Sequence, residues 1–167
     1  IISAMGYPIY NADLEARRIV DADPIVVASI KNLLGEGIYL NNQLNRRMVA
    51  EIVFSNQDML EKLNAIIHPA VAEHFSNWLI LYKSKSLVVK EAAILFESGA
   101  YKGVDKIIGV VAPKEIRVKR VVERDGLSEE SILSRMNNQL PQDELIKRSD
   151  YIIENDGVKL ILPQIVR

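Results

Sequence analysis

The chain alternates short apolar runs with longer segments in which apolar residues recur every three or four positions. The short runs predict strands at 7–10, 87–89, 105–111 and 151–154. The runs at 87–89 and 105–111 are rich in β-branched residues, which is typical of strands buried on both faces. Because helical segments separate the strands, their order predicts an α/β fold with a mostly parallel central sheet and helices on both sides.

Residues 24–83 show helical spacing and no strong strand pattern. Helices are predicted from Pro24 to a break at Gly35, over 45–54, after a capping box at 55–58, and again beyond a kink at His68–Pro69. Because this block lies between two predicted strands, we expect a helical insertion into an α/β core.

A helix that begins near Pro113 carries a stripe of arginines. Arg117, Arg120 and Arg124 lie three and four residues apart, so they share one face. Such a stripe is either solvated surface or a phosphate clamp, since guanidinium groups bind phosphate oxygens in pairs. The polar segment 125–139 follows it and is predicted to be a flap.

Length, net charge and composition exclude several classes of protein. At 167 residues the chain suits one domain, and its net charge of −1 gives no general attraction for nucleic acid or an anionic membrane. The absence of cysteine excludes disulfide scaffolds, thiolate metal sites and cysteine nucleophiles. The apolar runs are too short for a membrane span, and there is no signal-peptide pattern. We expect a cytoplasmic protein.

Acidic residues stand near two predicted strand ends. Asp13 is either a helix cap or a carboxylate that orients a substrate hydroxyl for attack. Glu91 and Glu97 follow the strand at 87–89, and they are either a general acid and base, or a residue near a metal and a cap. His68 is, on residue type alone, a structural histidine.

Six short elements follow one another in a specific order. They are Tyr10-Asn11-Ala12-Asp13 with Ala16-Arg17, Leu44-Asn45-Arg46, the His68-Pro69 helix end, Glu91 to Gly99, Arg120 with Arg124-Asp125-Gly126, and Ser149 to Gly157. No single element is decisive. Together, and along almost the whole chain, they resemble the motifs of the dephospho-CoA kinase family.

The resemblance implies a three-layer P-loop kinase fold of the nucleoside-monophosphate kinase type. Its parts would be a core at 1–22, 84–124 and 140–167, a helical CoA-binding insertion at 23–83, and a lid at 125–139. The implied reaction transfers the γ-phosphoryl group of ATP, with Mg²⁺, to the 3′-hydroxyl of dephospho-CoA. ATP and dephospho-CoA would be the only partners of a monomer or weak homo-oligomer.

The resemblance also assigns roles to individual residues. The expected catalytic residues are Asp13 and Arg120, the substrate-binding residues Arg17, His68 and Glu91, and the nucleotide-binding residues Arg124 and Asn155. No residue is expected to be a dedicated metal ligand.

Three departures from the family pattern are visible. Asn11 stands where the family has Asp, Ala93 stands where it has Pro, and no Gly-x-x-x-x-Gly-Lys-Ser/Thr occurs in the 167 residues. Because that loop normally holds the phosphates and Mg²⁺, we expect residues to be omitted before Ile1 or between Ile2 and Ser3. The alternatives are another small-molecule P-loop kinase, which the long insertion disfavours, and a catalytically dead nucleotide- or CoA-binding module.

Overall fold

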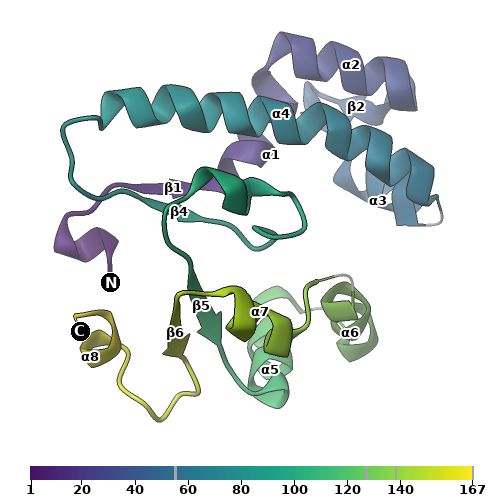
Figure 1. Ribbon diagram of the computed structural model, residues 1–167. Helices are drawn as coiled ribbons and strands as arrows, with labels where there is room; N and C mark the ends of the chain where they lie inside the picture. Colours follow the sequence, from purple (N-terminus) through teal and green to yellow (C-terminus); the bar gives the residue numbers. More distant parts are fainter. Residues whose placement is uncertain (55, 127, 138, 167) are drawn as a thin grey trace. The chain divides into compact units, whose positions relative to one another are not determined.

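The computed structural model describes residues 1–54, 56–126, 128–137 and 139–166. It divides into two compact units (Figure 1). The first unit is Ile2–Ala93, and the second runs from Ile94 to the end of the chain together with Ile1.

The first unit is built on a pair of parallel strands. The short helix η1 (Ser3–Met5) ends at Gly6, whose φ of 87° suits glycine, and β1 (Ile9–Asn11) follows. Strand β1 pairs in parallel with β4 (Val89–Glu91), so that Asn11 lies opposite Glu91. The chain turns from β1 directly into helix α1 (Ala12–Ala22), which places the first turn of α1 at the carboxyl end of both strands.

The segment between these strands is mostly helical, as expected, but it also contains strands. Its elements are α2 (Pro24–Leu34), η2 (Glu36–Ile38), β2 (Tyr39–Leu40), β3 (Gln43–Leu44), α3 (Arg46–Phe54) and α4 (Gln57–Leu81). The sequence predicts no strong strand here, and the strands present are short: β2 and β3, of two residues each, form a small antiparallel hairpin. Asn41 and Asn42 at its tip have φ of 50° and 62°, which asparagine tolerates better than most residues.

The helix expected beyond His68–Pro69 is not a separate one. Helix α4 runs without interruption through Pro69 and forms the long teal helix of Figure 1. A proline inside a helix removes one backbone hydrogen bond. Leu63 before Pro69 and Phe75 after it are both buried, so packing on both sides of the proline stabilises one continuous helix. The predicted cap Ser55 lies outside the described residues, and Asn56 caps α4 by accepting the Met59 N–H.

Two hydrophobic clusters fill the first unit. The larger one joins the helices and the hairpin and contains Ile19, Val20, Val26, Ile30, Ile38, Leu44, Val49 and Leu63. The smaller one contains Tyr10, Ala12 and Phe75 and lies where α4 covers the strand pair. Val71 of α4 packs against both clusters.

The second unit has its own parallel strand pair. Strand β5 (Ile108–Val111) pairs with β6 (Tyr151–Glu154), and the chain between them forms α5 (Lys114–Asp125), α6 (Glu129–Asn137) and α7 (Gln142–Arg148). Short helices η3 (Ala100–Gly103) and α8 (Leu162–Ile165) complete the unit. A Cβ at Gly109 would lie 2.7 Å from the Ser149 hydroxyl oxygen, so a larger residue there would require the Ser149 side chain to move.

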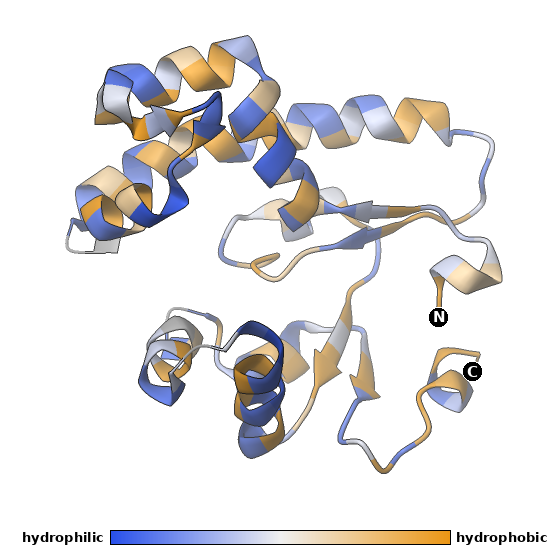
Figure 2. Cartoon of the chain, turned by 180° about the vertical axis from the view of Figure 1, so that it is seen from behind, coloured by the Kyte–Doolittle hydropathy of each residue, from blue (hydrophilic) through white to orange (hydrophobic). Residues whose placement is uncertain are grey.

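The strands are less buried than their sequences predict. Leu87 is 50% exposed and lies before β4, while Ile108 and Val110 of β5 are 47% and 57% exposed. Figure 2 colours most of β5 as hydrophobic. Burial on both faces is therefore wrong for the described residues. The reason is pairing: among those residues, β4 and β5 each have one neighbouring strand.

Candidate functional site

The first turn of α1 brings Asp13 to the end of the strand pair. Asn11 caps the helix, because its Oδ1 accepts the Leu14 N–H at 2.8 Å. Asp13 is therefore not the cap. Its Oδ2 instead accepts the backbone N–H of Ala93 at 3.1 Å, which ties α1 to the chain just after β4.

An open hollow of about 300 Å³ lies at this strand end. Its lining residues are Asn11, Asp13, Leu14, Arg17 and Glu91. Asp13 and Arg17 are one helical turn apart, so both side chains reach it from one face of α1. The hollow combines carboxylates, which accept hydrogen bonds from hydroxyl groups, with a guanidinium group, which binds anions. It brings together three of the residues predicted from sequence.

An aromatic cluster packs between the strand pair and helix α4. Tyr10 is 2% exposed, its hydroxyl oxygen lies 3.0 Å from His74 Nδ1, and its ring centroid is 4.9 Å from that of Phe75. Lys90, opposite Tyr10 in the strand pair, places its Nζ 4.2 Å from the Phe75 ring centroid. Burial raises the pKa of Tyr10 to about 12, with a smaller effect from Glu15, and burial lowers the pKa of Lys90.

The far end of α1 is held by the hairpin. Asp21 accepts the Leu44 N–H at 2.9 Å and the Arg46 guanidinium at 2.8 Å, while Arg46 also donates to the Arg17 carbonyl oxygen. Burial raises the pKa of Asp21, but these hydrogen bonds outweigh burial and lower it below its usual value. The backbone of Arg17 is therefore fixed by residues that do not line the hollow.

His68 lies apart from this hollow. It is half-buried in the middle of α4, and burial lowers its pKa. Among the described residues nothing donates a hydrogen bond to its ring or accepts one from it. The structure thus brings Asp13, Arg17 and Glu91 together and leaves His68 elsewhere in the same unit.

The arginines of α5, in the second unit, have three different environments. Arg120 donates to the carbonyl oxygen of Asn155 at 2.9 Å, which links α5 to the end of β6. Arg124 donates two hydrogen bonds to its neighbour Asp125. Arg117 is half-buried, and its Nε has no hydrogen-bond partner in the part of the chain that the structure describes. The stripe is thus not uniform solvated surface.

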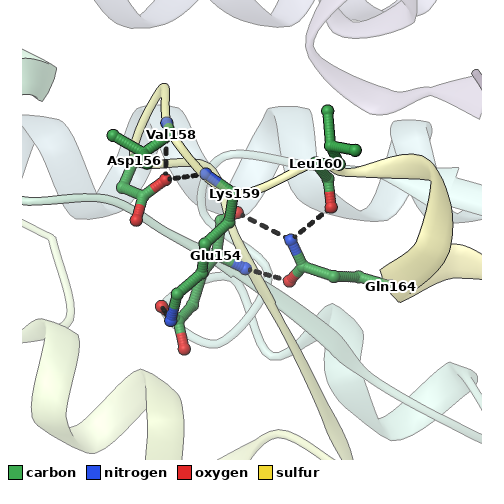
Figure 3. A network of polar contacts seen from close by, with 6 residues as sticks. All are labelled: Glu154, Asp156, Val158, Lys159, Leu160 and Gln164. Atoms are coloured by element: carbon green, nitrogen blue, oxygen red, sulfur yellow. Dashed lines mark hydrogen bonds and ion pairs between the residues drawn. The ribbon is translucent and has the colours of Figure 1, made fainter.

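A network of polar contacts shapes the loop after Asn155 (Figure 3). The Asp156 carboxylate accepts the N–H groups of Val158 and Lys159, which lowers its pKa, and the Lys159 ammonium pairs with Glu154. Gln164 accepts the Glu154 N–H and donates to the carbonyl oxygens of Glu154 and Leu160. The sequence predicts the turn at 155–157, but nothing in it signals the bridge made by Gln164.

The described residues lack two further features. No group of three or more His, Cys, Asp or Glu side chains is placed to hold a metal ion. None of the described helices combines the length and the apolar character that crossing a membrane requires.

Comparison with known proteins decides the family. The family model for dephospho-CoA kinase matches residues 1–160. The chain belongs to the dephospho-CoA kinase family. A dephospho-CoA kinase of Bacteroides fragilis is 37% identical over 166 residues, covering 99% of this chain and 81% of the relative. One of Porphyromonas gingivalis is 38% identical over 168 residues, covering 100% and 83%.

Solved structures agree with this assignment. A crystal structure of a Thermus thermophilus protein matches with a TM-score of 0.84 and 32% identity, covering 99% of this chain and 84% of that one. A dephospho-CoA kinase from Campylobacter jejuni matches with a TM-score of 0.64 and 30% identity, covering 92% and 78%. The family predicted from the motifs is confirmed, and so is the α/β kinase fold class.

Proposed function

We propose that the protein transfers the γ-phosphoryl group of ATP to the 3′-hydroxyl of dephospho-CoA, the last step of coenzyme A synthesis. Membership of the dephospho-CoA kinase family supports the reaction. The proposed location of the active site rests on one observation: the Asp13 carboxylate lies at a strand end, in an open hollow beside Arg17 and Glu91.

Asp13 is suited to orienting the hydroxyl that attacks the phosphoryl group. Its Oδ2 is held by the Ala93 N–H, so Oδ1 is the oxygen that accepts a hydrogen bond from the 3′-hydroxyl in our proposal. Arg17 binds an anionic group of dephospho-CoA, and the Glu91 carboxylate lies beside the reacting hydroxyl. His68 contributes to the substrate side from within the helical insertion.

The nucleotide side is assigned to the second unit. Arg120 and Arg124 bind the phosphates of ATP, where guanidinium groups stabilise the charge of a transferring phosphoryl group. Asn155 and the turn after it lie near the adenine. The hydrogen bond from Arg120 to the Asn155 carbonyl supports this assignment, because it already joins the two nucleotide-binding elements. Helices and hairpin 23–83 form the CoA-binding insertion, and 125–139 forms the lid, of which Leu127 and Asn138 lie outside the described residues.

The residues present fit a divalent cation that is bound mainly by phosphate. Kinases of this family use ATP, which generally needs a divalent metal, and we propose Mg²⁺. The hollow offers two carboxylates, Asp13 and Glu91, and Mg²⁺ in kinases uses one or two carboxylates with phosphate and water as its other ligands. When bound, Mg²⁺ neutralises negative charge on the phosphates.

We further propose that the protein works in the cytoplasm as a monomer or weak homo-oligomer. ATP and dephospho-CoA are its partners in this proposal. The net charge of −1 supports the exclusion of nucleic acid, since no general positive field recruits a polyanion.

Replacement of Asp13 tests the site. In the full-length protein with ATP, Mg²⁺ and dephospho-CoA, Asp13→Asn should lower kcat by about 100-fold or more and leave the KM for dephospho-CoA within about twofold. The matched control is Asp58→Asn, an exposed carboxylate in the first turn of α4 that pairs with Lys62. An equal loss in turnover and affinity contradicts the orienting role of Asp13.

The same assay separates the alternative functions. Failure of the wild-type protein to make CoA contradicts the proposed reaction. ADP release with another small-molecule acceptor favours a different kinase, and nucleotide binding without turnover favours a dead module. Reading the encoded residues before Ile1 and across Ile2–Ser3 for a Gly-x-x-x-x-Gly-Lys-Ser/Thr motif is the simplest companion test.

A further inference from the structure

Glu97 links the loop after β4 to the far end of the segment 125–139. Its Oε1 accepts the backbone N–H of Leu140 at 2.6 Å, although 43 residues separate the two in sequence. Leu140 is half-buried and precedes Pro141, which stands at the start of α7 and makes no side-chain capping bond. A hydrogen bond to a carboxylate is about twice as strong as a neutral one, so this contact fixes where the chain enters α7.

The loop that carries Glu97 is itself well held. The Tyr101 N–H donates to the Leu95 carbonyl oxygen at 3.2 Å, and Gly99 has a φ of 73° that suits glycine. The Phe96 ring lies 5.4 Å from the Tyr101 ring and 5.8 Å from the guanidinium carbon of Arg148. The loop therefore contacts α7 at both ends, through Leu140 just before it and Arg148 at its last residue.

We propose that Glu97 is a positioning residue that sets the returning end of the lid for ATP binding. This inference rests on the proposed function of 125–139. The outgoing end of that segment is set by backbone conformation, because Gly126 closes α5 with a φ of 65°. The returning end has no such glycine, and the Glu97 carboxylate supplies the constraint there. Glu97 acts through Leu140 and touches no reacting group.

Hydrogen exchange at one amide tests the anchor directly. In the full-length protein, Glu97→Ala should speed exchange of the Leu140 amide by about tenfold or more, since the bond that protects it is lost. Glu97→Gln keeps an acceptor oxygen and should speed it less. Glu115→Ala removes an exposed carboxylate from the first turn of α5 and should leave the exchange unchanged.

Kinetics test the role in ATP binding. Glu97→Ala should raise the KM for ATP by about three- to tenfold, leave the KM for dephospho-CoA unchanged, and be partly rescued by glutamine. Unchanged Leu140 exchange in Glu97→Ala overturns the anchor. Faster exchange with unchanged ATP kinetics overturns its role in ATP binding. A wild-type protein that makes no CoA instead refutes the proposed function and the lid role with it, while the exchange result still decides the anchor.

Discussion

Alkaline pH should weaken the fold through Tyr10. Burial raises the pKa of this phenol to about 12, against 10.0 for a free tyrosine. Between these values the unfolded chain loses the Tyr10 proton and the folded chain keeps it, so stability is full below pH 10 and falls as the pH rises towards 12. A shift of two pKa units corresponds to about 3 kcal/mol of folding stability. Because Tyr10 is only 2% exposed, screening by solvent reduces this value only slightly.

Urea unfolding at pH 9 and pH 11 measures this loss. The wild-type protein should lose about 1.4 kcal/mol more than Tyr10→Phe over this interval, because one pKa unit of the difference is then titrated. Tyr101→Phe is the control, since Tyr101 is 37% exposed. The same pH dependence in wild type and Tyr10→Phe refutes the reasoning.

Two further predictions concern other ionisable groups. A double-mutant cycle of Asp21→Ala and Arg46→Ala, followed by urea unfolding, should give a coupling of about 0.5–1 kcal/mol, because both side chains are partly exposed; zero coupling means that the pair does not brace α1. Burial lowers the pKa of His68, so the unfolded chain takes up its proton first and stability should fall as the pH drops below about 6.5. Urea unfolding midpoints from pH 5 to 7 check this. His68→Asn should reduce the loss of stability at acid pH, and an unchanged loss means that another group causes it.

Local signals predicted most of the elements. Pro24 begins α2, Gly35 follows its end and Gly126 closes α5, as the sequence indicates. These signals work because a cap acts on its own helix turn. The hairpin at 39–44 had a usable signal in Asn41–Asn42, a pair that suits a two-residue turn. The continuation of α4 through Pro69 had no such signal, because it depends on packing on both sides of the proline.

The sequence motifs predicted the residues that line the hollow, but not the long-range hydrogen bonds around them. Asp13, Arg17 and Glu91 share a hollow because α1 starts where β1 ends and β4 pairs beside it, an arrangement that the predicted parallel sheet implies. The bonds from Arg46 to Asp21 and from Leu140 to Glu97 join segments that are 25 and 43 residues apart. No local pattern encodes such pairs, since only the folded backbone brings them together.

Helix α4 connects the two parts of the first unit. Its 25 residues reach about 37 Å, far enough to pack on the strand pair at one end and on the helices and hairpin at the other. Val71 packs against both hydrophobic clusters, so the unfolding of one removes packing contacts from the other. The hollow beside Asp13 and the helical insertion should therefore unfold as one cooperative block, and a ligand that occupies the hollow should slow hydrogen exchange as far away as α2.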